Sequence, residues 1–265
     1  MDSALGQARD IVIKSKRIVL LTGAGISTDS GVPDFRGPAG VWTKDPDAEK
    51  LSDIRYYRAS TEIRKKAWIQ RLMQWEQMRH PNPGHLAIAG FESSNRLLAV
   101  ITQNVDGLHQ DAGTSPERLI EVHGTIRQVR CLTCDQRTPM GKTLERVRAG
   151  EADPACKACG GILKSDTISF GQSLNPETIR RASDAVAECD CLLAVGTSLQ
   201  VYPIAGLVPQ AVKTGASLLI VNQQATPMDH LASVVLHESI SEVSLLTDCL
   251  SAYPSAAEAV SGQRS

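Results

Sequence analysis

Several features that mark other classes of protein are missing from this sequence. No apolar run reaches the roughly 18 residues needed to cross a bilayer, and residues 1–17 contain no secretory apolar segment and no small-residue cleavage site. Neither charge dominates, because 28 Lys and Arg stand against 29 Asp and Glu and give a formal net charge of −1. We therefore expect a cytoplasmic protein with no membrane partner and no direct nucleic-acid partner.

Aromatic residues are scarce, and internal repeats and low-complexity tracts are absent. Phe, Trp and Tyr make up 4% of the 265 residues, whereas apolar residues as a whole reach 42%, which is usual for a globular protein. A chain of this length corresponds to one large domain or two unequal ones. The seven cysteines come without a secretory signal, and in a reducing compartment cysteine is more often metal-bound or buried than disulfide-bonded.

The apolar pattern predicts a parallel β-sheet covered by helices. Short continuous apolar runs indicate strands buried on both faces, and they alternate with segments of helical pattern. The expected strands are residues 17–21, 97–101, 191–195, 218–221 and 234–236. The expected helices are residues 61–78, 85–91, 177–187 and 203–213.

Two stretches interrupt this alternation and predict a smaller second domain. Residues 43–83 have a helical pattern but no strand, and residues 128–164 hold four cysteines among turn residues. The predicted fold is therefore α/β, a Rossmann-like parallel sheet with a helical insertion and a zinc-ribbon insertion. The predicted boundaries are 1–42, 84–127 and 165–250 for a discontinuous Rossmann-like domain, 43–83 and 128–164 for the small domain, and 251–265 for a flexible tail.

The first predicted strand runs into Gly23-Ala24-Gly25, which indicates a phosphate-binding turn. Glycines let backbone N–H groups approach a phosphate closely. The full dinucleotide fingerprint needs a glycine at position 28, where this chain has Thr28, so a tight turn without a ligand is an equal alternative for these residues alone. The Gly- and Pro-rich run that follows, residues 28–42, favours a functional loop, because long ordered loops are disproportionately functional.

Polar side chains also follow three other predicted strands. Ligands bind at the carboxyl ends of strands in an open α/β sheet, so these residues are candidate contacts. The amide and carboxylate groups after the second strand suit ribose hydroxyls and a carboxamide, although an Asx-type turn is an alternative for Asn104 alone. The candidates are Gln103, Asn104, Asp106, Gly196, Thr197, Ser198, Asn222 and Gln223.

His123 is the histidine best placed for catalysis, because it lies between the polar loop at 102–113 and the cysteine cluster. With an ordinary pKa of about 6.5, its imidazole can act as a general base at neutral pH. A lone histidine is more often structural than catalytic. His109 is the other candidate, and its place in the middle of the polar motif favours a structural role.

Four cysteines form two CxxC pairs, Cys131-x-x-Cys134 and Cys156-x-x-Cys159, with 21 residues between the pairs. This spacing predicts a tetrahedral thiolate site for one zinc ion. Four protein ligands close the coordination sphere, so the zinc is expected to be structural rather than catalytic. Cys189 and Cys191 lack the spacing and are expected to be small buried apolar residues.

In their order along the chain, these motifs resemble those of the sirtuins, a family of NAD-dependent protein deacylases. The resemblance runs from about Lys16 to Leu250 and rests on GAGIS, GVPDFRG, TQNVDGLHQDAG, EVHGT, the paired CxxC motifs, SFGQSL, VGTSLQVYP and NQQATP. It implies a Rossmann-type domain and a small zinc-ribbon and helical domain, with NAD and an acyl-lysine protein or peptide meeting between them. The implied reaction moves the acyl group, most often acetyl, from lysine to ADP-ribose and releases nicotinamide.

The resemblance also implies a role for each matching residue. His123 matches the general base, Asn104 the residue that orients the nicotinamide ribose, and Asp106 the residue that holds the nicotinamide carboxamide. Phe35 would shield the reacting ribose from water. The remaining implied NAD contacts are Gly23, Ala24, Gly25, Asp34, Arg36, Trp42, Gln103, Gly196, Thr197, Ser198, Asn222, Gln223, Gln224 and Ile240.

The sequence departs from the family pattern at several positions. Gln172 and Gln223 stand where the family often has Glu, and Ser165 stands where it usually has Pro. Members that remove succinyl or malonyl groups carry a Tyr-x-x-Arg pair in the helical insertion, which Trp68-x-x-Arg71 matches imperfectly. The departures leave the acyl preference and the contacts with the peptide open.

Three other functions share part of the pattern. A protein mono-ADP-ribosyltransferase would share the first chemical step, and a non-catalytic zinc-knuckle module would not require His123 or Asn104. A dehydrogenase is disfavoured because Thr28 breaks its fingerprint. Nicotinamide release from NAD, measured with and without an acyl-peptide, separates these functions. The protein targets and the oligomeric state are not specified by the sequence.

Overall fold

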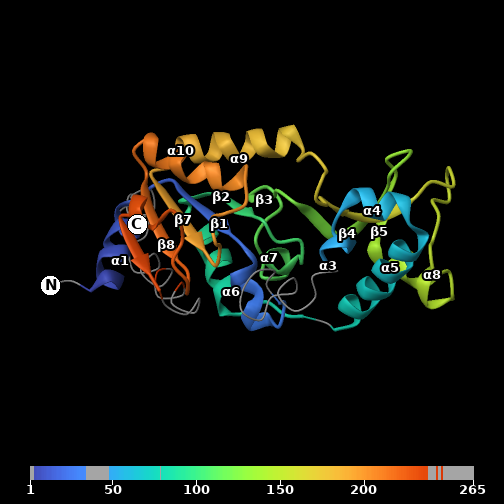
Figure 1. Ribbon diagram of the computed structural model, residues 1–265. Helices are drawn as coiled ribbons and strands as arrows, with labels where there is room; N and C mark the ends of the chain where they lie inside the picture. Colours follow the sequence, from blue (N-terminus) through green and yellow to red (C-terminus); the bar gives the residue numbers. More distant parts are fainter. Residues whose placement is uncertain (1–2, 34–47, 78, 238–242, 244–245, 247–265) are drawn as a thin grey trace, which may run out of the picture.

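The computed structural model describes residues 3–33, 48–77, 79–237, 243 and 246 (Figure 1). A six-stranded parallel sheet forms its larger part, with strand order β3-β2-β1-β7-β8-β9. The strands are β1 (Ile18–Thr22), β2 (Leu97–Thr102), β3 (Leu119–Glu121), β7 (Cys191–Val195), β8 (Ser217–Val221) and β9 (Val234–Leu236). All five predicted strands are present, and β3 is an addition. Among the residues that the structure describes, no helix is long and apolar enough to span a bilayer.

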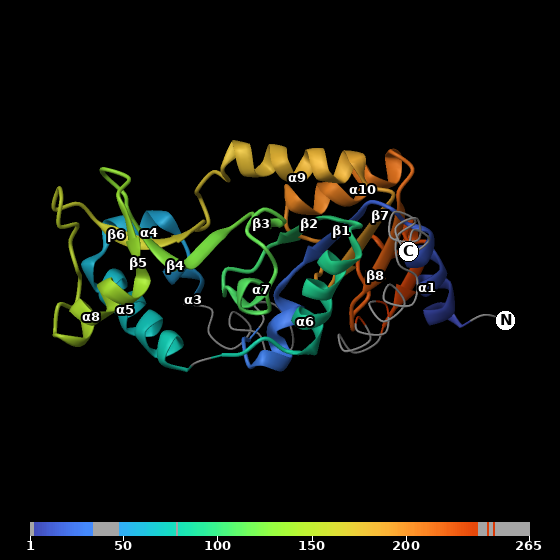
Figure 2. The same ribbon diagram turned by 180° about the vertical axis from the view of Figure 1, so that it is seen from behind.

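Helices cover both faces of this sheet and produce two apolar cores (Figures 1 and 2). They are α1 (Ala4–Lys14), α6 (Pro83–Gly90), α7 (Leu108–Asp111), α9 (Pro176–Glu188) and α10 (Leu207–Lys213), with short 3-10 helices η1 (Ala24–Ser30), η2 (Phe91–Ser94), η3 (Ile204–Gly206) and η4 (Asp229–Leu231). Ile18 and Leu20 of β1 belong to the core shared with α1 and α6. Val19 and Leu21 belong to the core shared with α9 and α10. A strand buried on both faces requires the continuous apolar run that β1 has.

Two helix starts follow directly from local sequence. The Asn175 side chain accepts hydrogen bonds from the backbone N–H groups of residues 177 and 178, and Pro176 takes the first helical position of α9. Asn82 and Pro83 begin α6 in the same way. The predicted helix at 203–213 differs, because its first turn is η3 and only residues 207–213 are α-helical.

A three-stranded antiparallel sheet, with strand order β5-β4-β6, forms a second and smaller part of the structure together with the helices packed on it. We call this part the small layer system. Its elements are α3 (Ala48–Leu51), α4 (Ile54–Ala59), α5 (Thr61–Glu76), β4 (Gly124–Cys131), β5 (Arg137–Pro139), α8 (Met140–Arg148) and β6 (Leu163–Thr167). Trp68 of α5 is fully buried against Val129, Met140 and Leu144 in a separate apolar cluster. The α/β fold class with an added small sheet is therefore confirmed, while the residue boundaries of the two domains stay a prediction.

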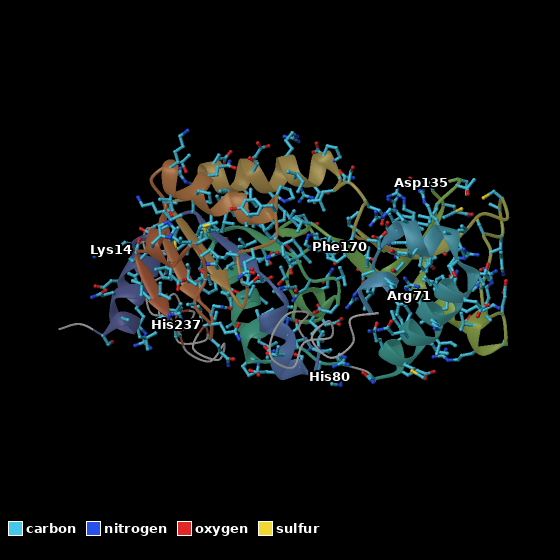
Figure 3. The ribbon with its side chains drawn as sticks, in the orientation of Figure 1. Lys14, Arg71, His80, Asp135, Phe170 and His237 are labelled. Atoms are coloured by element: carbon cyan, nitrogen blue, oxygen red, sulfur yellow. The ribbon has the colours of Figure 1, made fainter. Side chains whose placement is uncertain are left out.

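Strand β4 connects the two sheets. It begins immediately after His123, at the edge of the large sheet, and ends at Cys131 in the cysteine cluster. The segment after β6 returns alongside it, since Ile168 N donates to His123 O at 2.8 Å. Figure 3 shows Phe170 between the two parts, with Arg71 and Asp135 on the side of the small sheet and Lys14 and His237 at the opposite end.

Candidate functional site

The loops after β1 and β7 meet backbone to backbone at the carboxyl edge of the large sheet. Gly25 N donates to Gly196 O at 2.8 Å. Gly196 has a φ of 58°, and a Cβ there would lie 2.3 Å from Ile26 N. A Cβ on Gly25 would lie 2.7 Å from Gly196 O. Glycine is therefore required for this approach, and it places Gly23, Ala24 and Gly25 beside the end of β7.

We expect Gly196→Ala to lower the free energy of unfolding by about 2 to 5 kcal/mol, from about 1–2 kcal/mol for a left-handed non-glycine residue and about 1–3 kcal/mol for overpacking. Urea denaturation measures this loss. Gly215→Ala is the matched control, because Gly215 has a φ of 93° but a Cβ there has no atom within 4 Å. Equal losses in the two variants would show that the contact with η1 is not what requires glycine.

Asn104, Ser27 and Asp106 form a hydrogen-bonded cluster beside the first glycine. Asn104 Nδ2 donates to Gly23 O and to Ser27 Oγ, both at 3.0 Å. Ser27 Oγ donates to Asp106 Oδ2 at 2.8 Å, and the other carboxylate oxygen of Asp106 accepts from Leu108 N at 3.0 Å. The Asx-type turn thus belongs to Asp106, while Asn104 joins the loops after β1 and β2.

One buried histidine contacts this cluster, and a second packs against the ring of the first. His85 Nε2 lies 3.3 Å from Ser27 Oγ, and its Nδ1 lies 3.1 Å from Asn82 Oδ1. His109 Nε2 lies 3.0 Å from Thr22 Oγ1. Burial lowers the pKa of His85 and lowers that of His109 to about 3, so both rings are neutral at pH 7.

Ser27 and His85 are absent from the residues that the sequence analysis singled out. Ser27 is the last residue of the GAGIS motif, which was the available signal for it. His85 is the third residue of a helix that Asn82 caps, and its side chain takes part in a capping box. That pattern marks a local structural role, so the link from His85 to Ser27, 58 residues away, carried no sequence signal.

His123 lies at the same edge, half-buried, with its Nδ1 2.9 Å from Gln103 O. A carbonyl oxygen only accepts, so Nδ1 carries the proton of the neutral ring and Nε2 keeps a free lone pair. Burial lowers the pKa of His123 from its usual value, and the Gln103 carbonyl opposes part of this effect. The ring is therefore neutral near pH 7, which is the form that accepts a proton.

Gln103 connects this histidine to the loop after β7. Its Nε2 donates to Thr197 Oγ1 at 2.9 Å, and its backbone N donates to Thr22 O at 3.0 Å. Ser198 follows in the same loop and is partly exposed. The loops after β1, β2, β3 and β7 are thus joined by hydrogen bonds along one edge of the sheet.

The candidates after β8 lie one strand further along. Asn222 Nδ2 donates to Gln224 O at 2.7 Å, which closes their loop with Gln223 exposed at its tip. Gly196 N donates to Val221 O at 2.9 Å and joins the loop after β7 to the last residue of β8. The remaining predicted contacts lie outside the described residues: Asp34, Phe35, Arg36, Trp42 and Ile240.

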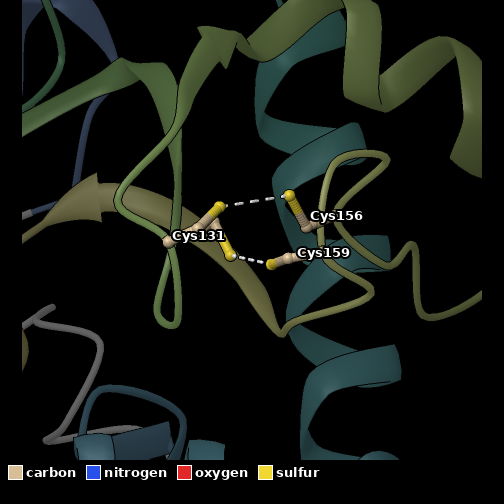
Figure 4. Close-up of side chains that lie close together, drawn as sticks. Cys131, Cys156 and Cys159 are labelled. Atoms are coloured by element: carbon tan, nitrogen blue, oxygen red, sulfur yellow. Dashed lines mark hydrogen bonds between the residues drawn. The ribbon is translucent and has the colours of Figure 1, made fainter.

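The four predicted metal ligands converge at the end of β4 (Figure 4). The Sγ atoms of Cys131 and Cys159 are 3.5 Å apart, and those of Cys134 and Cys156 are 3.7 Å apart. Sulfurs around a tetrahedral zinc ion lie about 3.8 Å apart, since each Zn–S bond is about 2.3 Å, whereas a disulfide needs about 2.05 Å. All four sulfurs lie within 4.8 Å of one another. The cluster is consistent with a structural zinc site.

Comparison with known proteins gives one family. A family model described as the Sir2 family matches residues 23–203. A relative named NAD-dependent protein deacetylase 2, from Streptomyces coelicolor, is 47% identical over 223 residues, which are 84% of this chain and 92% of the relative. An NAD-dependent protein deacetylase from Caldivirga maquilingensis is 42% identical over 238 residues, 89% of each chain.

Solved structures agree over nearly the whole length. One, described as showing the structural basis for the mechanism and regulation of Sir2 enzymes, has a TM-score of 0.85 and 34% identity, and the match covers 95% of this chain and 99% of the other. A second, described as Sir2 with a p53 peptide and NAD+, has a TM-score of 0.77 and 30% identity over 89% of this chain and 93% of the other.

Proposed function

This chain belongs to the Sir2 family, the sirtuins, and is an NAD-dependent protein deacetylase, and from that premise we propose which of its residues carry the reaction. His123 is the general base and Asn104 orients the ribose that reacts. Asp106 receives the nicotinamide carboxamide. The observation that supports these roles most directly is the hydrogen bond from His123 Nδ1 to Gln103 O, which leaves Nε2 as the unprotonated nitrogen of a neutral imidazole at this edge.

The residues at this edge fit NAD as the co-substrate. Gly23, Gly25 and Gly196 let the loops after β1 and β7 lie against each other, because a Cβ on any of them would clash with the facing loop, and a glycine-rich strand end of this kind accommodates a pyrophosphate. Bound NAD supplies an electrophilic ribose carbon and a leaving group, nicotinamide. His123 Nε2 accepts the proton of a ribose hydroxyl group. The hydrogen bond from Nδ1 to Gln103 O keeps the ring in one orientation. We propose that the rest of NAD is bound by residues 196–198 after β7 and residues 222–224 after β8.

We propose acetyl-lysine proteins or peptides as the acyl substrates of this chain. One related structure is described with a deacetylated p53 peptide and 3′-O-acetyl ADP-ribose. The Arg71 guanidinium, a candidate for binding an acidic acyl group, lies over the rings of Tyr57 and Trp68 at 5.3 and 5.0 Å, and its Nε donates to Ser165 Oγ at 3.3 Å. These contacts hold it within the small layer system, which favours acetyl over succinyl or malonyl. The four reduced thiols of a zinc site favour the cytoplasm as the working compartment.

Nicotinamide release tests these assignments. Wild-type protein is expected to release nicotinamide from NAD with an acetyl-lysine peptide and to do so much more slowly with a succinyl-lysine peptide. Faster turnover of the succinyl peptide would contradict the acetyl assignment. Label from adenine-labelled NAD that accumulates on protein would favour ADP-ribosyl transfer to protein instead.

The lowered pKa of His123 predicts a pH profile. A base must be unprotonated, so the deacetylation rate is expected to stay level from about pH 8 to 7 and to fall as the pH drops through a value below 6.5. The measurement is kcat/KM for the acetyl peptide from pH 5 to 8, with zinc content checked at each pH because thiolate ligands are protonated in acid. A midpoint above 7 would contradict the proposed base.

A further inference from the structure

The loop that carries Asp106 is fastened to the start of β4 at consecutive positions. Val105 O accepts from Ile126 N at 2.9 Å, and Gly107 O accepts from Arg127 Nη2, also at 2.9 Å. Asp106 lies between these two carbonyls, and both of its carboxylate oxygens are hydrogen-bonded within the site. The direction of the Asp106 carboxylate therefore depends on where β4 holds the peptide groups on either side of it.

Arg127 occupies the space that a side chain at position 107 would need. Gly107 has a φ of 81°, and a Cβ there would lie 2.0 Å from Arg127 Nε. The same Nη2 atom pairs with Asp111 Oδ2 at 2.6 Å, but the side chains of Arg127 and Asp111 are 38% and 45% exposed. An ion pair in such contact with water contributes little by itself. The hydrogen bond from Arg127 Nη2 to Gly107 O, rather than the ion pair, is thus the contact that holds this loop in place.

The surroundings of Arg127 are costly for stability. Among the described residues, its Nε is buried and has no hydrogen-bond partner, and a buried unpaired donor destabilises a fold. Burial raises the pKa of Glu121, while the charge of Arg127 acts in the opposite direction and that of Asp106 acts with burial. The charge of Arg127 therefore reduces the repulsion between the carboxylates of Glu121 and Asp106. Its unpaired Nε lowers the stability of the fold, and a buried unpaired group in a native structure indicates a function.

We propose that Arg127 is a positioning residue for the nicotinamide end of the site: by holding the Gly107 carbonyl, it sets the direction of the Asp106 carboxylate. The inference rests on the role proposed above for Asp106. It adds a function for β4, the strand that begins directly after His123 and ends at Cys131.

The test compares Arg127→Met with Arg130→Met. Methionine keeps most of the length of the side chain but removes its charge and donors. Arg130 lies on the same strand, and its side chain forms ion pairs with Asp135 and Asp166 of the small layer system, so its variant is the matched control. For Arg127→Met, the KM for NAD and the inhibition constant of nicotinamide are each expected to rise about tenfold, the range of one charge-assisted hydrogen bond. The kcat and the KM for the acetyl peptide should change less than about twofold.

Two further variants separate the carbonyl contact from the ion pair. Asp111→Asn keeps the carbonyl contact and is expected to leave nicotinamide inhibition unchanged. Arg127→Lys keeps the charge but loses the planar fork of the guanidinium, and it is expected to restore less than half of the loss. Full loss in Asp111→Asn, or full recovery in Arg127→Lys, would assign the effect to charge alone and overturn the proposal.

The failure of this inference is distinguishable from failure of the proposed function. Arg127→Met with wild-type KM for NAD and wild-type nicotinamide inhibition overturns the role of Arg127. If Asp106→Asn still weakens nicotinamide inhibition in that case, the proposed function stands. If Asp106→Asn also has no effect, the role of Asp106 falls with it. A lower melting temperature with an equal fall in kcat for every substrate would mark Arg127 as merely structural.

Discussion

Replacing His123 by alanine is expected to lower the deacetylation rate by about two to four orders of magnitude, the usual contribution of a positioned general base. The reason is the free Nε2 of a ring whose other nitrogen is held by Gln103 O. Single-turnover and steady-state assays with an acetyl peptide measure the loss. The KM for NAD should change little, because the glycine turn after β1 and the loops after β7 and β8 remain.

The fold of this variant should survive, since His123 is half-buried and its backbone carbonyl still accepts from Ile168 N. His230→Ala is the matched control, because His230 is exposed on η4, beyond the end of β8. It should keep full activity. A His123→Ala protein that deacetylates at a near wild-type rate would show that the imidazole is structural, and the proposed mechanism would be wrong.

Removing one zinc ligand is expected to cause the largest loss of stability. Cys131→Ala leaves three thiolates, and the small layer system should lose its metal and several kcal/mol of stability, since zinc binding in isolated zinc-finger peptides amounts to about 10 kcal/mol or more. Metal analysis should find one zinc ion per chain in the wild type and far less in the variant. Thermal denaturation should show an early transition, with Trp68 leaving its buried position beside Cys131.

Cys189→Ala is the control for this experiment. Cys189 is buried at the end of α9, where its Sγ donates to Val186 O, and it lies outside the cluster. This variant should keep one zinc ion and a single transition. A Cys131→Ala protein with unchanged zinc content and unchanged melting would contradict a structural zinc site at these four cysteines.

The large sheet was predictable because its strands are apolar on both faces. β1 and β7 are buried at every residue, and short apolar runs of four residues in β1 and five in β7 are typical of strands that lie between two helical layers. β3 escaped prediction because only two of its three residues, Leu119 and Ile120, are apolar, whereas the equally short β9 is apolar throughout. α8 was missed although Met140, Leu144 and Val147 follow a helical period, since the cysteines around it drew the interpretation toward a ribbon without helices.

The site was predictable where residues follow a strand, and obscure where they reach it from elsewhere. Asn104 lies two residues after the end of β2, and Gly196 directly follows β7, so their place at the edge follows from topology alone. His85 reaches Ser27 from a helix on one face, and Arg127 reaches the Asp106 loop from a different sheet. Contacts of this kind depend on the packing of elements, which no local pattern encodes.

The position of β1 at the centre of the large sheet has a consequence for biosynthesis. β1 pairs with β7 along its whole length, from Ile18 with Cys191 to Thr22 with Val195, and the hydrogen bond at the start of this pair joins residues 173 apart. At roughly 5–20 residues per second, a ribosome needs roughly 10–35 s to make that interval. Throughout this time, an apolar strand made near the beginning of the chain has no partner for one of its two edges. The nascent protein therefore acquires the β1–β7 junction late in translation, after both small-sheet insertions have been made.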